Sequence, residues 1–182
     1  WTATDVCGNA TSSTQTLTVT DTIDPVLENV PGNITVECDN IPGVEDVEAS
    51  DNCDMDLEVM FSDEFVANQG CGYTIIRTWT VEDNCGNEAS ASQEITVIDT
   101  TAPVASHEPA DVIIECSDDV PTDEPTFEDN CDETVTVGFD QTTQPGNCPN
   151  NYVIVKTWTA MDDCGNPTIV VQNITVQDTT DP

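Results

Sequence analysis

The sequence predicts an all-β chain of tandem repeats, and two observations carry this prediction. A motif of the form Trp-Thr-x-x-Asp-x-Cys-Gly-Asn occurs three times, beginning at Trp1, Trp79 and Trp158, with spacings of 78 and 79 residues. In residues 73–81, which include the start of the second copy, the side-chain type alternates along the chain with the period of two that a β-strand has. Cys-Gly-Asn then supplies a turn, since glycine readily adopts a positive φ, and a second alternating run follows. Each copy of the motif therefore predicts a β-hairpin.

The repeat period also predicts the domain boundaries. A linker of the form Asp-Thr-x-x-Pro opens each complete repeat, and its proline cannot donate to a central strand ladder. We expect the C-terminal hairpin of an incomplete preceding domain at 1–20, complete domains at 21–98 and 99–177, and a linker to a following repeat at 178–182.

Within each complete domain the same order of short strands recurs. Alternating runs occur at 34–38 and 57–61 in the first domain and at 112–116 and 135–139 in the second. No stretch shows the i, i+3, i+4, i+7 apolar spacing of a helix. Short strands with turn signals at close intervals are typical of an immunoglobulin-like β-sandwich. The predicted fold class is therefore all-β, with tandem immunoglobulin-like domains.

The charge of the chain limits its partners. It has 36 acidic residues against two basic ones, a formal net charge of −34. Nucleic acids and anionic membrane surfaces need lysine and arginine, so neither is an expected partner. No run of 18 apolar residues occurs, so membrane insertion is not expected either. Two interpretations of the acidity remain open, namely a solvated surface suited to salty water and specific cation sites.

Nine cysteines predict an oxidising, extracellular compartment and domains stapled by disulfides. Zinc is disfavoured because no Cys-x-x-Cys pair occurs and His107 is the sole histidine. A linear array needs the chain to enter each domain at one end, the leading end, and to leave at the other, the trailing end. This places Cys38 with Cys71 at the trailing end and Cys53 with Cys85 at the leading end. The expected pairs are Cys38–Cys71, Cys53–Cys85, Cys116–Cys148 and Cys131–Cys164, with the partner of Cys7 in the preceding domain.

Catalysis finds little support in the sequence. His107 has no counterpart in the first domain, and no serine stands in a Gly-x-Ser-x-Gly motif. We therefore expect no enzymatic activity and name no catalytic residue. The two cations, Arg77 and Lys156, each precede a motif tryptophan by two residues and so share its face of the strand. This position favours a packing role with a cation–π contact.

These motifs together resemble the hyalin-type (HYR-like) immunoglobulin-like repeats, in the cysteine-bearing version found in giant secreted adhesins and surface filament proteins of Bacteroidota. The matching residues are the linker 21–25, Val36-Glu37-Cys38, Asp51-Asn52-Cys53 and the segment 77–87, with their counterparts in the second domain. The resemblance implies a non-enzymatic cell-adhesion protein at the bacterial cell surface, whose repeats form a rigid spacer or stalk.

The partners implied are neighbouring repeats of the same long chain. A second partner class is an identical chain joined by strand addition in a fibre. The alternative function is a ligand-binding module whose end loops recognise a glycan or a protein. Binding loops should differ between repeats, whereas the Asp-Asn-Cys-Asp and Cys-Gly-Asn turns recur here. The recurrence favours the spacer over the ligand-binding module.

Calcium is the expected cofactor, bound at the domain junctions. The predicted topology brings three acidic segments to the leading end of each domain, and calcium takes six to eight oxygen ligands. Glu37 or Asp39 could add a ligand from the trailing end. The competing interpretation is that aspartate and asparagine only cap turns there. The candidate ligands are Asp21, Asp24, Asp51, Asp54, Asp83 and Asn87 in the first domain, and Asp99, Asp129, Asp132, Asp162 and Asn166 in the second.

Overall fold

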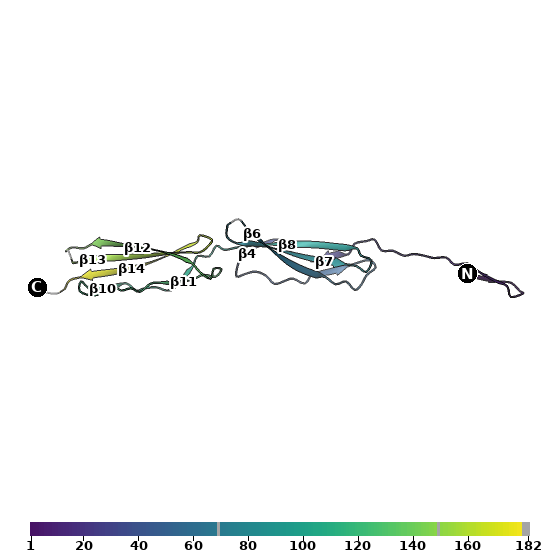
Figure 1. The fold of residues 1–182 in the computed structure, drawn as a ribbon, viewed down its shortest axis with the longest axis horizontal. Helices are drawn as coiled ribbons and strands as arrows, with labels where there is room; N and C mark the ends of the chain where they lie inside the picture. The colour runs from purple at the N-terminus through teal and green to yellow at the C-terminus, as the bar shows by residue number, and fades with distance from the viewer. Residues whose placement is uncertain (69, 149, 180–182) are drawn as a thin grey trace. The chain divides into compact units, whose positions relative to one another are not determined.

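The computed structural model describes residues 1–68, 70–148 and 150–179, and its regular elements are all β-strands (Figure 1). Residues 180–182 of the predicted C-terminal linker lie outside the described residues. Within the described residues there is no helix long and apolar enough to cross a membrane. The predicted fold class, all-β with tandem immunoglobulin-like sandwiches, is confirmed.

The same set of sheets occurs in both complete repeats. A four-stranded sheet has the order β4-β8-β7-β6 in the first repeat and β10-β14-β13-β12 in the second. A two-stranded sheet accompanies each of them, β3-β5 in the first and β9-β11 in the second, and β1 pairs with β2 as a separate hairpin. The strands are β1 (Thr2–Thr4), β2 (Ala10–Ser12), β3 (Val26–Glu28), β4 (Ile34–Glu37), β5 (Glu48–Ser50), β6 (Met60–Ala67), β7 (Tyr73–Glu82), β8 (Glu88–Ile98), β9 (Val104–His107), β10 (Val112–Glu115), β11 (Thr126–Glu128), β12 (Thr136–Pro145), β13 (Tyr152–Met161) and β14 (Pro167–Gln177).

Strand directions explain how cysteines reach the two ends of a repeat. In the second repeat β10 pairs parallel with β14, and β14 pairs antiparallel with β13. The motif strand β13 therefore runs antiparallel to the first strand of its sheet, as the sequence predicted. In the first repeat β4 likewise pairs parallel with β8. The residue that follows β4 therefore lies at the end of the repeat where the chain leaves β8.

The chain divides into two compact units. The first comprises residues 1–30, 45–62 and 78–92, and the second comprises residues 31–44, 63–77 and 93–182. In the first unit, β3 pairs with β5, and Val47, Trp79 and Val81 are buried. The second unit contains the end of the first repeat together with the second repeat, and the candidate site lies in this unit.

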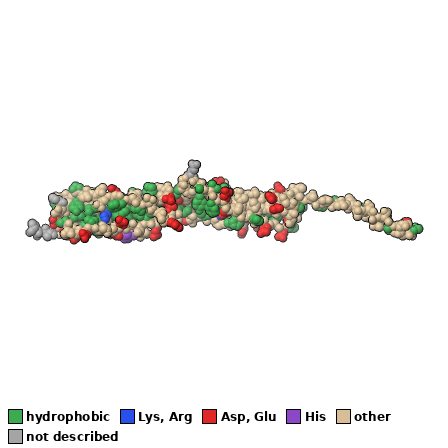
Figure 2. All heavy atoms as spheres, in the orientation of Figure 1, with side chains coloured by type: hydrophobic (Ala, Val, Ile, Leu, Met, Phe, Trp, Pro, Cys, Tyr) green, Lys and Arg blue, Asp and Glu red, His purple; other side chains and the backbone are tan. Residues whose placement is uncertain are grey.

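The second unit has two hydrophobic clusters built from alternating strand residues. One consists of Ile75, Ile95 and Val97, and the other consists of Ile154, Ile174 and Val176. Side chains of β13 and β14 are buried at every second position over much of their length, as the period-2 pattern requires. Acidic side chains are scattered over the visible face rather than gathered in one patch (Figure 2).

The two cations are buried, but they contact different partners. The guanidinium of Arg77 donates to Asp63 through Nε at 2.9 Å and through Nη2 at 3.1 Å, and Nη1 donates to the Gly43 carbonyl at 2.9 Å. Lys156 donates from Nζ to the Pro121 carbonyl and lies 6.0 Å from the ring centroid of Trp158. The predicted cation–π contact is thus confirmed for Lys156, whereas Arg77 forms a bidentate ion pair.

Replacing Arg77 by methionine should lower the free energy of unfolding by about 3 kcal/mol, because Asp63 would lose its partner in a partly buried site. Arg77→Lys should cost less, since Lys156 reaches a backbone carbonyl from the equivalent position. Lys156→Met is the matched control and should cost less than Arg77→Met, because among the described residues Lys156 has no carboxylate partner. Urea unfolding measures all three. Equal, small losses for the two Arg77 variants would contradict a stabilising ion pair.

Candidate functional site

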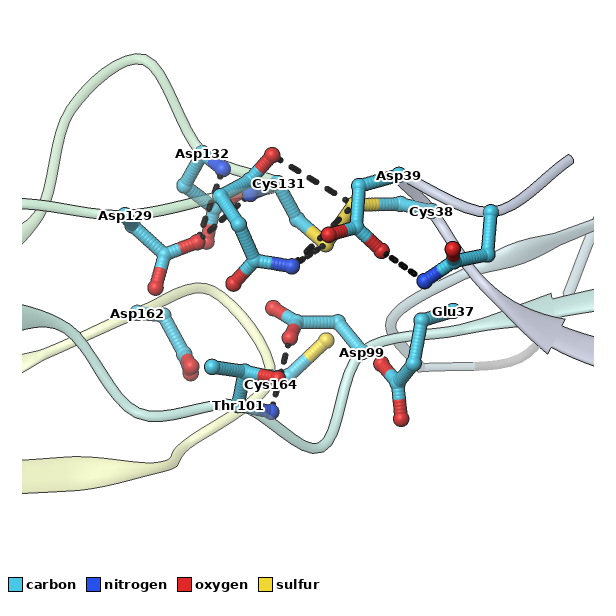
Figure 3. Close-up of a disulfide and its surroundings, with 12 residues drawn as sticks. Glu37, Cys38, Asp39, Asp99, Thr101, Asp129, Cys131, Asp132, Asp162 and Cys164 are labelled. Carbon is cyan, nitrogen blue, oxygen red and sulfur yellow. Dashed lines mark hydrogen bonds between the residues drawn. A yellow bond between two sulfur atoms is a disulfide. The ribbon is translucent and has the colours of Figure 1, made fainter.

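Two disulfides join the end of the first repeat to the start of the second. Cys38, which follows β4, is bonded to Cys131, with 5.7 Å between their Cα atoms (Figure 3). Cys71, which precedes β7, is bonded to Cys164, with 4.9 Å between their Cα atoms. Each bond joins residues 93 positions apart in the sequence. These four residues, called the junction cysteines below, therefore link consecutive repeats rather than stapling each repeat internally.

The structure contradicts the predicted pairs Cys38–Cys71 and Cys131–Cys164. The prediction correctly placed Cys38 with Cys71, and all four junction cysteines line one groove. It paired cysteines only within one repeat, whereas in the structure the leading end of the next repeat supplies both partners.

The other two predicted pairs, Cys53–Cys85 and Cys116–Cys148, are not formed either. In the described part of the chain these four residues, called the outer cysteines below, are exposed free thiols. Cys7 is also an exposed free thiol. Each outer cysteine is the repeat equivalent of one junction cysteine.

The linker between the repeats forms hydrogen bonds with the first repeat through Glu37 and with the second repeat through Asn166. Glu37, the last residue of β4, accepts hydrogen bonds from the backbone nitrogen of Thr100 at 3.1 Å and from its hydroxyl. On the other side, Asn166 donates from Nδ2 to the Asp99 carbonyl at 3.3 Å. Glu37 thus fixes the linker rather than pointing into the acidic group. Asp39, the other residue predicted as an added ligand, accepts a hydrogen bond from Asn40 Nδ2.

Asp99, Asp132 and Asp162 bring their carboxylate oxygens within 4.8 Å of one another. They come from the linker, from the loop after β11 and from the turn after β13, so one residue arrives from each predicted acidic segment. Asp99 is only 8% exposed, and its buried Oδ2 atom has no hydrogen-bond partner among the residues that the structure describes. Figure 3 shows these three residues beside the Cys38–Cys131 disulfide. Burial raises the pKa of Asp99, and the charges of Asp129, Asp162 and Asp132 raise it further.

Asp129 and Asp162 each accept more hydrogen bonds than Asp99, which accepts one from the backbone nitrogen of Thr101. Asp129 accepts through Oδ1 from the backbone nitrogens of Cys131 at 2.8 Å and Asp132 at 3.0 Å, although its Oδ2 is also buried without a partner. Burial disfavours the charge of Asp162, but two hydrogen bonds from Asn166, each 2.7 Å long, help to outweigh it and its pKa is lowered. Asp162 is therefore a stable carboxylate, whereas Asp99 has a charge that the protein atoms satisfy poorly. Asp99 and Asp129 also lie within 4.8 Å of Cys131, whose sulfur is already in a disulfide.

The first repeat has an equivalent acidic group at its own leading end, formed by Asp21, Asp51 and Asp83. The Asp51 Oδ1 atom is buried without a partner. Backbone donors from Cys53 and Asp54 lower the pKa of Asp51, and donation from Asn87 lowers that of Asp83. Each repeat thus has a group of three carboxylates drawn from its linker and two turns, although the middle member is Asp51 in the first repeat and Asp132, the equivalent of Asp54, in the second.

Some predicted ligands have other roles in the structure. Asp24 and Asp54 lie outside the carboxylate groups, and Asp54 accepts from the backbone nitrogen of Asn84 at 3.0 Å. Asn87 and Asn166 donate from Nδ2 to Asp83 and Asp162, so they orient carboxylates. The repeating Asp-x-x-x-Asn spacing in the hairpin turns was the signal for this positioning role.

Comparisons with known proteins agree with a repeat architecture of hyalin type. No family model matches the chain. Hyalin from Lytechinus variegatus is 33% identical over 196 residues, which cover 98% of this chain and 36% of that protein. Hyalin from Strongylocentrotus purpuratus is 31% identical over 198 residues, which cover 100% of this chain and 16% of that protein. The chain therefore spans about a third of one curated relative and about a sixth of the other.

Both hyalins are sea urchin proteins, so they support the predicted repeat type but not the expected origin in Bacteroidota. Solved structures match at low TM-scores. Drosophila N-cadherin EC1-4 gives 0.33 at 15% identity, covering 85% of this chain and 50% of that chain. Human mucin-like protocadherin EC1-2 gives 0.36 at 10% identity, covering 85% and 98%. The fold class therefore rests on the strands and sheets of this structure itself.

Proposed function

We propose that this chain is a non-enzymatic segment of a long extracellular adhesion protein of hyalin type. The repeats 21–98 and 99–177 act as a rigid spacer in a stalk or surface filament. The observation that carries the proposal is the pair of disulfides Cys38–Cys131 and Cys71–Cys164. With the linker 99–103 they give the junction three covalent connections, so that bending between these segments is opposed. Structural disulfides also fit an oxidising extracellular compartment.

We further propose that calcium binds at the leading end of each repeat. Its ligands would include Asp99, Asp132 and Asp162 in the second repeat, and the equivalent group in the first. The support is the buried, unpartnered Oδ2 atom of Asp99 among other carboxylates, since a desolvated charge without a partner is unfavourable. A hard divalent cation with oxygen ligands would offset both the desolvation and the mutual repulsion.

The neighbouring repeats of the same chain are the partners we propose first. An identical chain added by strand pairing is the second, and the support for it is that β1 and β2 are exposed at every residue. The two partner classes differ chemically, because strand addition needs no disulfide.

Small-angle scattering of the monomer fraction tests the spacer proposal. The oxidised chain should give a narrow distribution of particle dimensions, and serine at all four junction cysteines should broaden it, because one flexible connection would replace three. Serine at all four outer cysteines is the matched control and should leave the distribution unchanged. If the junction variant scatters like the wild type, the disulfides do not stiffen the chain and the spacer proposal fails.

A further inference from the structure

We infer that the outer cysteines form two further junctions of the same kind, with Cys53 and Cys85 at the leading end and Cys116 and Cys148 at the trailing end. Each of these cysteine pairs would bond to another repeat of this type. Cys38 pairs with Cys131 and Cys71 pairs with Cys164. Cys116 and Cys148 are the repeat equivalents of Cys38 and Cys71, whereas Cys53 and Cys85 are the equivalents of Cys131 and Cys164. The same junction between two copies would therefore contain a Cys116–Cys53 bond and a Cys148–Cys85 bond. The occupant is thus a repeat with the complementary end, and the contact is covalent and directional. The inference rests on the proposed repeat array and extends it beyond this chain.

The leading end of the first repeat already has the local structure that presents Cys131 and Cys164 in the second. The backbone nitrogen of Cys53 donates to Asp51 at 2.7 Å, as that of Cys131 donates to Asp129 at 2.8 Å. Asn52 donates to the Cys53 sulfur at 2.9 Å, matching the 3.2 Å contact from Asn130 to Cys131. The leading-end turn therefore forms without a bonded partner.

The two turns that carry the leading-end cysteines are also tied together in the same way. Asn84, next to Cys85, donates its backbone nitrogen to Asp54 at 3.0 Å. Asp163, next to Cys164, donates its backbone nitrogen to Asp132 at 2.8 Å. Cys53 and Cys85 are consequently held on neighbouring turns, as their bonded equivalents are.

The trailing end of the second repeat reproduces the other half of the junction. Glu115, the last residue of β10, accepts from Thr179 through its backbone nitrogen at 3.1 Å and its hydroxyl at 2.7 Å. Glu37 holds Thr100 with the same two hydrogen bonds before the bonded Cys38. Cys116 follows Glu115 directly, so this end is organised to meet a next repeat.

The loop that carries Cys148 differs from the loop that carries Cys71. Gly72 has a φ of 83°, and an added Cβ there would come within 2.3 Å of the Val97 carbonyl oxygen. In the second repeat the loop is closed by backbone hydrogen bonds from Gly146 to Asn151 at 2.7 Å and from Asn151 to Cys148 at 3.0 Å. Because the two loops differ, the formation of the Cys116–Cys53 bond does not establish the Cys148–Cys85 bond, and each bond must be identified by its own peptide.

The bonds form by oxidation, for which a low-molecular-weight disulfide such as oxidised glutathione is the oxidant. Two cysteine thiols and one oxidised glutathione give one protein disulfide and two glutathione thiols, so that electrons and protons balance. Since the leading and trailing ends are different, one copy can bind at each end of a chain.

Two half-blocked variants test the inference, both also carrying Cys7→Ser to remove the remaining free thiol. One has serine at Cys53 and Cys85, and the other has serine at Cys116 and Cys148. In a glutathione redox buffer each variant alone should stay monomeric on non-reducing gels, and an equal mixture should give a dimer. The single variant Cys7→Ser should give a ladder of multimers. Peptide mapping of the dimer should find Cys116 bonded to Cys53 and Cys148 bonded to Cys85.

Other outcomes would overturn the inference. These are a Cys53–Cys85 or Cys116–Cys148 bond within one chain, a dimer of either variant alone, a mixture that stays monomeric, or multimers that persist after reduction, as strand addition would give. None of them would alter the scattering comparison at the junction cysteines, so the spacer proposal is judged independently.

Discussion

Serine at all four junction cysteines should lower the free energy of unfolding of the oxidised chain by at least about 5 kcal/mol and should divide its unfolding into two transitions. Each bond closes a loop between residues 93 positions apart. The chain-entropy relation gives about 4.6 kcal/mol for one such loop, and the second bond across the same junction adds less. Because both bonds connect the second repeat to the end of the first, we expect these parts to unfold together while the bonds are present and separately once they are lost.

Tryptophan fluorescence during urea unfolding provides the measurement. Trp79 is 2% exposed and Trp158 is 3% exposed, so each reports on the packing of its own repeat. The wild type should give one transition, and the junction variant should give two. Serine at the four outer cysteines is the matched control, and it should change stability by no more than about 0.5 kcal/mol, because those thiols are exposed and unbonded. A similar loss in both variants would show that cysteine replacement itself, rather than the junction, is responsible.

The features that the sequence predicted well depend on local patterns. The alternation in residues 73–81 becomes β7, in which Ile75, Trp79 and Val81 are buried on one face. Three acidic segments were expected to converge at each leading end, and each segment contributes one aspartate to a carboxylate group. Strand period and turn chemistry are properties of neighbouring residues, so they can be recognised without the tertiary structure.

Partner choice could not be predicted in the same way. The position of Cys38 at a trailing end followed from strand direction, but its bond to Cys131 depends on how one repeat meets the next. Likewise, the sequence placed Arg77 beside Trp79, whereas the carboxylate that Arg77 contacts is Asp63 on the adjacent strand β6. With 36 acidic residues in the chain, composition alone cannot select that one. Specific pairs are thus decided by three-dimensional proximity.

Asp99→Asn should have opposite effects on stability with and without calcium. In chelator it should raise the melting temperature, because it removes a buried charge whose Oδ2 atom has no partner. The sign follows from the pKa of Asp99, which burial raises. The native state then holds this proton more tightly than the unfolded chain does. The bound proton stabilises the native state at pH values below the pKa that Asp99 has in the unfolded chain, and this stabilisation is lost as the pH rises through the pKa that it has in the folded chain. At neutral pH the ionised Asp99 carboxylate therefore destabilises the native chain.

With calcium the order should reverse. Calcium at ten times its dissociation constant should stabilise the wild type by about 1.4 kcal/mol per site, roughly 3–6 °C in melting temperature. Asp99→Asn should lose the stabilisation that calcium gives at the site of the second repeat and keep that of the first. Calorimetric titration should count two calcium ions for the wild type and one for Asp99→Asn. It should count none for the double variant that also carries Asp21→Asn, since Asp21 belongs to the equivalent group. Asp24→Asn is the control, because Asp24 is exposed and lies outside both groups. If Asp99→Asn and Asp24→Asn bind calcium as the wild type does, the carboxylates at the junction only cap turns.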